Sequence, residues 1–540
     1  MTSAGPHLPD GISYMGTVVF VEVSMTASSR RRALVVAAFL TVLTVFGAQL
    51  LRAAAELQAP EPVTAIVGGT VIDGNGGPPL KDATVVIEGK RIKSVGPRAS
   101  MVVPKDAVTI DATGKFITPG FVDTNVHVSL YGGGAKDRKE TSVRYQDASA
   151  RLTLEAAQMQ LRYGITTIRD SYGALLPLIE VRDAIARGAA IGPRLLAAGN
   201  IVGWGGPYSI SFAQINERDL SLYEEQFTDF IAQGAGEDLM TMYPEELRVA
   251  INKYLDKGPN FIKYGGTSHW SNPTFIGFSP DAQKVIVDET HKRGLFAETH
   301  ATSPEGLKLA IQAGIDLIQH PEVLDGREMS DALIAQIRDR KIIGSMLVSS
   351  ITGEAWKKHL KDKEAAKRRI EERDAQTADS GLKKNVARSK TSAEKRRDDQ
   401  ALGVEMEMRR RNAQKIINAG CVVTVGTDNY AGASPEYTRT PKPMWQEPGL
   451  GTIIAIEGLV ELGMTPAQAI VSASRNGAIA SKGLKEFGTI EAGKVADILV
   501  LGGDPLTDIS NIRKLAVLIR DGKTIDRTRL PTDPVMYRPE

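Results

Sequence analysis

Cysteine is almost absent from this chain of 540 residues, and its charges nearly cancel. The single cysteine, Cys421, excludes an intramolecular disulfide framework and a cysteine-rich zinc module. The 66 basic and 64 acidic side chains leave a formal net charge of +2, so the overall charge gives no argument for nucleic-acid binding. Any metal chemistry must therefore use nitrogen and oxygen ligands, and the seven histidines are the first candidates.

Long hydrophobic runs are also missing, with one exception near the N-terminus. Arg30, Arg31 and Arg32 precede a mostly apolar run from Ala33 to Leu51, and the small residues 53–55 follow as a cleavage pattern. We therefore expect residues 1–55 to be an export signal, which would make the mature protein periplasmic or extracellular. The alternative is an uncleaved anchor that tethers the protein to a membrane, because the run approaches the ~20 residues that span a bilayer.

The two ends of the remaining chain share a strand-rich pattern. Short runs rich in Val, Ile and Thr, separated by Gly and Pro, cover residues 63–118, and similar runs recur at 496–501 and 515–519. We expect residues 56–118 and 480–540 to form one composite β-sandwich domain.

The middle of the chain alternates between strand and helix patterns. Helical patterns such as 303–314 and 330–341 separate most of eight apolar, strand-like runs, which predicts an α/β fold, namely a (β/α)8 TIM-type barrel over residues 119–479. A doubly wound sheet is the alternative, but the Gly-rich fingerprint after its first strand is missing. The eight runs are 116–128, 165–170, 194–201, 261–264, 295–300, 316–320, 342–348 and 422–427.

One segment, residues 355–411, departs from this alternation because it is densely charged. Its acidic and basic side chains are mixed, which is typical of a solvated helical insertion. A lid over the site or a contact between subunits are the alternatives.

Five chemistry-bearing side chains follow the predicted strands. His127 ends the first strand, Lys263 lies at the end of the fourth, His300 and His320 close the fifth and sixth, and Asp428 follows the eighth. Functional residues of such barrels lie at the C-terminal ends of the strands, so we expect these side chains to converge. Imidazole and carboxylate ligands suit Zn, Fe, Co or Mn.

The motifs around these residues resemble those of the amidohydrolase superfamily, especially its imidazolonepropionase and prolidase-like branch. The resemblance covers about residues 60–535 and implies a metal-dependent hydrolase of C–N bonds. The motifs are PGFVDTNVH at 119–127, GITTIRD at 164–170, IGPR at 191–194, the pair His300 and His320, GTD at 426–428 and GTIEAGKVAD at 488–497.

The resemblance also implies a division of roles within the site. Lys263 would be carboxylated and would bridge two divalent metal ions, with zinc expected first and Co, Mn or Fe as alternatives. His300 and His320 would hold one ion, and His127 and Asp428 the other. Asp428 would also take the proton of the attacking water and pass it to the leaving nitrogen. The modification is a prerequisite, because an unmodified ammonium group only donates hydrogen bonds.

The pattern departs from the superfamily at Asn125, where a histidine is usual. An amide oxygen is a weaker ligand than imidazole, so we expect the ion near Asn125 to be held weakly. A mononuclear site, in which Asn125 only forms hydrogen bonds, is the alternative. The Asn-x-His pattern is similar to that of the phenylurea hydrolases and molinate hydrolase, which implies small ureas, carbamates or amides as substrates.

Three further side chains are expected near the substrate. His269 follows the Lys263 strand and is expected to contact the substrate or a transition-state oxygen. Trp204 and Tyr131 are expected to line the pocket, because pockets favour aromatic walls. The Gly-rich segment 132–136 lacks the Lys-Ser/Thr ending of a phosphate loop.

Two other functions compete with this one. A prolidase-like dipeptidase would need a basic side chain for the substrate carboxylate, and Arg169 or Arg144 would be available. A non-catalytic scaffold is disfavoured, because a scaffold has no physical need for this set of side chains. As partners we expect a small-molecule substrate, no nucleic acid, and a second copy of the chain in a homo-oligomer.

Overall fold

The structure is a computed structural model. It describes residues 61–130, 143–206, 208–213, 220–269, 274–379, 390–430 and 444–537. The predicted export segment 1–55, the predicted pocket residue Tyr131 and the Gly-rich segment 132–136 therefore lie outside the described residues. Within these described ranges, no helix combines the length and the apolar character that a membrane span requires.

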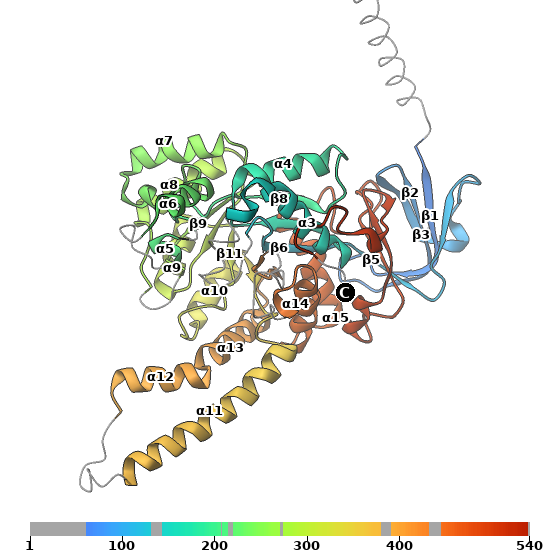
Figure 1. The fold of residues 1–540 in the computed structure, drawn as a ribbon. Coiled ribbons are helices and arrows are strands. Elements are labelled where there is room, and N and C mark those ends of the chain that lie inside the picture. Colours follow the sequence, from blue (N-terminus) through green and yellow to red (C-terminus); the bar gives the residue numbers. More distant parts are fainter. Residues whose placement is uncertain are drawn as a thin grey trace, which may run out of the picture. The chain divides into compact units, whose positions relative to one another are not determined.

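An eight-stranded sheet joins strands from the two ends of the described chain. Its order is β17-β16-β15-β5-β1-β2-β3, with β4 beside β1. The link between the two ends is the antiparallel pair β5 and β15, in which Phe116 faces Leu501 and Pro119 faces Ile498. Figure 1 shows the first strands in blue beside the C-terminal segment in red. The strands are β1 (Val63–Val71), β2 (Leu80–Glu88), β3 (Arg91–Pro97), β4 (Val108–Asp111), β5 (Phe116–Pro119), β15 (Ile498–Leu501), β16 (Leu515–Arg520) and β17 (Lys523–Thr524).

One hydrophobic core belongs to this sheet and contains residues from both ends. Ile66, Val85 and Ile117 pack with Ile498 and Ile519, and all five are fully buried. Burial of such side chains stabilises the sheet by roughly 1.5–3 kcal/mol each. Hydrogen bonds join all eight strands in one sheet, and their division into the two layers of a sandwich stays a prediction.

The residues after β17 do not extend the sheet, although the sequence analysis placed 480–540 in one domain with it. The backbone N–H groups of Val535, Met536 and Tyr537 donate to the carboxylate of Glu155 on α3 (Ser149–Arg162). This contact satisfies backbone donors that have no strand partner. The end of the described chain is therefore anchored to a helix of the middle region.

Two parallel sheets occupy the middle of the chain. One has the order β14-β6-β7-β8 and the other the order β13-β12-β11-β10-β9. Their strands are buried on both faces, which is typical of parallel sheets covered by helices. The strands are β6 (Phe121–His127), β7 (Ile165–Asp170), β8 (Arg194–Ala197), β9 (Ile262–Gly265), β10 (Ala297–His300), β11 (Leu317–Gln319), β12 (Ile343–Met346), β13 (Val423–Val425) and β14 (Asn429–Tyr430).

Backbone hydrogen bonds connect the two parallel sheets at both of their edges. On one side, the Val202 N–H donates to the Lys263 carbonyl, and the Gly265 N–H donates to the Val202 carbonyl. On the other side, the N–H groups of Thr427 and Asp428 both donate to the Asn125 carbonyl. The α/β class predicted from the sequence is therefore confirmed, and the ends of β6 and β9 lie in connected sheets.

Helices separate the successive parallel strands. Three of them begin at serines, Ser279, Ser303 and Ser330, whose hydroxyl oxygens accept N–H groups of the first turn. The helices predicted at 303–314 and 330–341 are confirmed as α9 and α10. Besides α3, the helices are α4 (Leu175–Ala186), α5 (Ile210–Ala213), α6 (Leu222–Ala232), α7 (Pro244–Leu255), α8 (Pro280–Lys292), α9 (Pro304–Ala313), α10 (Asp331–Asp339), α11 (Gly353–Asp379), α12 (Ser392–Leu402), α13 (Val404–Asn418), α14 (Leu450–Glu461), α15 (Pro466–Val471) and α16 (Gly477–Ala480).

The run 116–128, expected to be one strand, is divided at Gly120 into β5 and β6. A Cβ at Gly120 would lie 2.1 Å from Thr166 Oγ1, so only glycine fits this close approach. Pro119 ends the last strand of the N-terminal part of the eight-stranded sheet, and Phe121 begins the first strand of the parallel sheets. The expectation of one continuous strand was therefore wrong.

The charged segment is helical in its described part, as predicted. Ion pairs from Asp398 of α12 to Arg373 of α11 and to Lys390 join the two helices, which run side by side in Figure 1. The following helix, α13, differs from a solvated helix. Its Asn412 and Ile416 are buried, and Asn412 Oδ1 accepts the Met329 N–H at 2.8 Å.

Candidate active site

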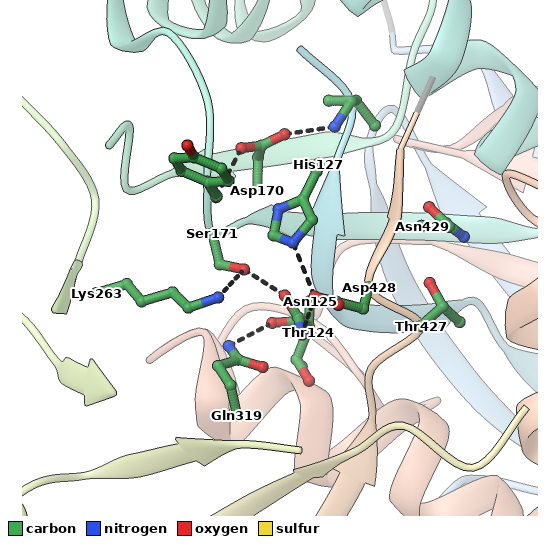
Figure 2. A network of polar contacts seen from close by, with 12 residues as sticks. Thr124, Asn125, His127, Asp170, Ser171, Lys263, Gln319, Thr427, Asp428 and Asn429 are labelled. Atoms are coloured by element: carbon green, nitrogen blue, oxygen red, sulfur yellow. Dashed lines mark hydrogen bonds and ion pairs between the residues drawn. The ribbon is translucent and has the colours of Figure 1, made fainter. Parts of the chain in front are cut away.

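Strand β6 carries Asn125 and His127 to a direct contact with Asp428. The imidazole Nε2 of His127 lies 2.8 Å from Asp428 Oδ1, and Asn125 Nδ2 donates to the same oxygen at 3.0 Å (Figure 2). Asn125 and His127 share one face of the strand because side chains alternate with a period of two. Three of the predicted site residues are therefore in mutual contact.

A buried carboxylate, Asp123, fixes the segment that carries Asp428. Its Oδ2 accepts the hydroxyls of Thr427 and Thr452, both at 2.7 Å. Burial raises the pKa of Asp123 to about 6, against the effect of these hydrogen bonds. The sequence analysis missed this role, although Asp123 lies on the same strand face as Asn125 within a motif that it had singled out.

Lys263 is connected to Asn125 through a residue that the sequence analysis also missed. Lys263 Nζ on β9 donates to Ser171 Oγ at 3.5 Å, and Ser171 Oγ in turn donates to Asn125 Oδ1 (Figure 2). All three residues are buried. Ser171 directly follows β7, so the rule that places functional residues at strand ends would have found it.

His300 and His320 face each other at the ends of β10 and β11. Their ring centroids are 4.6 Å apart. Three buried ring nitrogens make no hydrogen bond to the described part of the chain: His300 Nε2, His320 Nδ1 and His127 Nδ1. Buried polar atoms usually have a partner, so these nitrogens require an explanation in terms of function.

Burial holds the predicted histidine ligands in their neutral form. It lowers the pKa of His320 to about 3 and moves the pKa of His300 well below its usual range. It also lowers the pKa of His127, although the nearby carboxylate of Asp428 acts in the opposite direction. A neutral imidazole has the lone pair that a metal ligand needs.

Lys263 and Asp428 are shifted in ways that also suit ligation. Burial lowers the pKa of the Lys263 ammonium, which favours the neutral amine. For Asp428, burial would raise the pKa, but the contact with His127 Nε2 at 2.8 Å holds it well below its usual range. The carboxylate of Asp428 is therefore ionised at neutral pH.

The backbone is strained at two of the predicted residues. His320 has φ 37° and Asp428 has φ 54°, values in the left-handed region that side-chain-bearing residues rarely adopt. Such strain concentrates at functional sites, where the surrounding structure enforces it. At Asp428, the bonds from its own N–H and that of Thr427 to the Asn125 carbonyl hold this geometry.

An aromatic wall adjoins the histidines. The Trp204 ring is 4.6 Å from His300 and 5.6 Å from His269, between ring centroids, and Trp204 Nε1 donates to the Thr267 carbonyl at 3.1 Å. Phe212 stacks on His269 at 4.5 Å. His269 and Trp204 are thus placed beside His300. Phe212 is a further wall residue, and no motif in the sequence pointed to it.

One of the two basic residues named for binding a substrate carboxylate, Arg169, is engaged inside the protein. Arg169 is buried, and it donates to Glu298 at 2.6 Å and to the Ala480 carbonyl at 2.5 Å. Its guanidinium also lies 3.8 Å from the Phe261 ring centroid. Because these interactions engage Arg169 inside the protein, it is not available to bind the substrate carboxylate of the dipeptidase alternative. Arg144 is exposed.

The donor set was tested for its fit to a divalent metal ion. Over the ranges that the structure describes, no three or more His, Cys, Asp or Glu side chains are grouped as a metal site. The predicted ligands instead form two contacting pairs, His127 with Asp428 and His300 with His320. Neutral imidazoles with unpartnered nitrogens and an ionised carboxylate are chemically suited to such an ion, and His127, His300, His320 and Asp428 supply them.

Comparisons with known proteins agree on one relationship. The sequence model of the Amidohydrolase family matches residues 116–525. The solved structure of molinate hydrolase is similar, with a TM-score of 0.75 and 29% identity, covering 89% of this chain and 98% of that one. Phenylurea hydrolase B gives a TM-score of 0.76 and 27% identity, covering 88% and 100%. Ochratoxinase from Aspergillus niger is 26% identical over 464 residues, which are 83% of this chain and 82% of that protein.

Proposed function

Because this chain belongs to the amidohydrolase family, we propose that it is a hydrolase that cleaves a carbon–nitrogen bond in a small amide, urea or carbamate. The family resemblance inferred from the motifs is confirmed. The observation that carries the proposal is the position of the Asp428 carboxylate, which His127 and Asn125 both contact.

The proposed architecture is a (β/α)8 barrel. Its support is that hydrogen bonds link the two parallel sheets at both edges, through Val202 on one side and the Asn125 carbonyl on the other. Barrels of this kind carry their active sites at the C-terminal ends of the strands. His127 and His300 end β6 and β10, His320 directly follows β11, and Asp428 lies between β13 and β14.

The proposed metal centre uses the side chains predicted from the sequence. His300 and His320 would hold one divalent ion, zinc being expected first, and His127 and Asp428 would hold a second. Lys263 would be carboxylated and would supply carbamate oxygens as further ligands: its neutral amine would add to CO2, a C–N bond would form as one C–O π bond of CO2 opens, and one proton would pass from the nitrogen to solvent. A bound divalent ion lowers the pKa of a water molecule toward 7 and polarises a substrate carbonyl.

The residues of the chain itself would then carry the proton transfers. Asp428 Oδ1 accepts hydrogen bonds, so its carboxylate can take a proton from the attacking water and return it to the leaving nitrogen. His269 and Trp204 lie beside His300, where they would contact the substrate and exclude solvent water. A dry site strengthens the electrostatic interactions within it.

The substrate class is proposed from the relatives and from Asn125. Molinate hydrolase and phenylurea hydrolase B are named for a thiocarbamate and for ureas, and both share more than a quarter of their residues with this chain. A dipeptidase receives less support, because Arg169 is engaged with Glu298. Export or membrane tethering through residues 1–55, and assembly into a homo-oligomer, are proposed from the sequence alone.

A panel assay tests the proposal. The purified protein is incubated with N-aryl ureas, thiocarbamates, aryl amides and dipeptides, and amine release is measured for the parent and for Lys263→Ala. We expect hydrolysis of a urea, carbamate or amide by the parent and a loss of more than about 100-fold in the variant. Enrichment with ¹³C-bicarbonate should give a carbamate ¹³C signal in the parent that Lys263→Ala lacks. Hydrolysis of none of these compounds by a metal-containing parent would contradict the proposed function.

A further inference from the structure

The orientation of the Asn125 carboxamide follows from the chemistry of its neighbours. The two ends of the Asn125 carboxamide have different partners, and its NH2 group is the end that faces Asp428. Asn125 Nδ2 lies 3.0 Å from Asp428 Oδ1. The amide oxygen then points the other way, toward Ser171.

Ser171 completes this arrangement because a hydroxyl has a single hydrogen to donate. An amide oxygen only accepts hydrogen bonds, so the Ser171 hydroxyl must donate its hydrogen to Asn125 Oδ1. The remaining contact, with Lys263 Nζ at 3.5 Å, is therefore one in which the lysine donates. A carboxylated lysine keeps one N–H, so the direction of the chain from Lys263 through Ser171 and Asn125 to Asp428 holds in both states.

We propose that Ser171 is a positioning residue, which holds the Asn125 carboxamide with its nitrogen directed at Asp428 and so fixes the carboxylate that faces the reacting groups. Asn125 is in this arrangement a hydrogen-bond donor to Asp428 and not a ligand. The inference rests on the proposed function for its catalytic meaning, but the orientation itself is a property of the folded chain.

Burial makes the hydrogen bond of the Ser171 hydroxyl difficult to replace. Ser171 and Asn125 are fully buried, and Lys263 is 1% exposed, so water cannot readily replace a lost donor. Each residue also comes from a different strand end, β7, β6 and β9 (Figure 2). A change at Ser171 therefore reaches Asp428 through the hydrogen bonds of Asn125.

The test compares Ser171→Ala with the rescue variant Ser171→Thr and the matched control Ser349→Ala. Ser349 is also buried, and its hydroxyl makes no hydrogen bond to the described residues. The full-length protein is labelled with side-chain ¹⁵N-asparagine, and the Asn125 NH2 signals are assigned as those absent from Asn125→Ala. Bound metal and the kinetics of hydrolysis are measured on the same preparations.

We expect Ser171→Ala to shift or broaden the Asn125 NH2 signals and to lower kcat about 10-fold, the effect of one net hydrogen bond of ~1.4 kcal/mol. KM and bound metal should stay within about twofold. Ser171→Thr should restore both the signals and kcat, and Ser349→Ala should change neither. In the Asn125→Ala background, adding Ser171→Ala should have no further effect on kcat.

Three outcomes would overturn the inference. The first is that the Asn125 NH2 signals are unchanged in Ser171→Ala, at any level of activity. This comparison does not need Ser171→Thr, so it tests the inference even if that variant does not fold. The second is loss of metal from Ser171→Ala, and the third is additive losses in the double variant. Signals that shift as expected in a protein that hydrolyses no compound of the panel would support the orientation by Ser171 and contradict the proposed function.

Discussion

Asn125 donates a hydrogen bond to Asp428 at 3.0 Å, from the strand position where the amidohydrolase superfamily usually has a histidine. His127 meets the same carboxylate oxygen at 2.8 Å. The carboxylate is thus held by one imidazole and one amide. The substitution of amide for imidazole distinguishes the two halves of the proposed metal centre.

Replacing Asn125 by histidine should strengthen metal binding. The parent should retain one ion per chain after dialysis, because Asn125 places an amide where the half of the centre at His127 would usually have an additional imidazole ligand. Asn125→His adds an imidazole there, and we expect a second ion with at least roughly 10-fold tighter binding, the scale on which changes in a ligand shell act. Metal analysis by mass spectrometry measures this. Two tightly held ions in the parent would show that the weak-site prediction is wrong.

Replacing Asp428, the proposed proton acceptor, should strongly reduce the rate of hydrolysis. Asp428→Asn keeps the shape of the side chain but replaces a carboxylate oxygen with an amide, so kcat/KM should fall about 10²- to 10⁴-fold. The control is Asp288→Asn on the exposed side of α8, where Asp288 pairs with Lys284, and its kcat/KM should match the parent. Residual activity within tenfold of the parent in Asp428→Asn would assign the proton transfer to another group.

The aromatic wall should determine how well aryl substrates bind. Trp204→Ala removes the ring beside His300, so KM for an aryl urea or amide should rise about 10-fold, while an alkyl analogue should be affected less. Trp356 on α11 is the matched control, because its ring packs on Arg410 and His359 within the charged segment. Equal effects of the two tryptophan variants on KM would contradict a substrate-facing wall.

The site was largely predictable from the sequence because one rule covers most of it. The strand-end rule selected His127, Lys263, His300, His320 and Asp428 as candidates, and apolar runs predicted the parallel strands. The orientation of Asn125 was not predictable. Its two partners, Ser171 and Asp428, lie 46 and 303 residues away in the chain, and nothing in a sequence period indicates which way a carboxamide faces.

The fold shows the same division between local and distant information. Helix α9 was predicted to within one residue at each end, because Ser303 caps its start and Gly314, with φ 94°, ends it. The contact of the C-terminal residues 535–537 with Glu155 was not anticipated, since no local pattern pairs an isolated carboxylate with backbone N–H groups 380 or more residues away.

Acid should weaken the contact between α7 and α8. Lys292, Asn252 and Arg248 bind Glu289 and lower its pKa from 4.5 to about 2, with the hydrogen bond from Lys292 as the largest cause. A depressed pKa stabilises the folded state above pH 4.5, and this contribution is lost as the pH falls from 4.5 to 2. Glu289→Gln should therefore lower the Tm at pH 7 by roughly 1–3 °C, and calorimetry should find a smaller difference at pH 3. A difference that grows on acidification would contradict the assignment.

Metal-dependent hydrolysis is the central claim, and one measurement addresses it most directly. Amine release from a panel of aryl ureas, thiocarbamates and amides is followed for the purified protein before chelation, after chelation, and after zinc is added back. We predict hydrolysis of at least one compound, loss of that hydrolysis on chelation, and its recovery with zinc. Hydrolysis that persists in protein shown by elemental analysis to be free of metal would contradict the account.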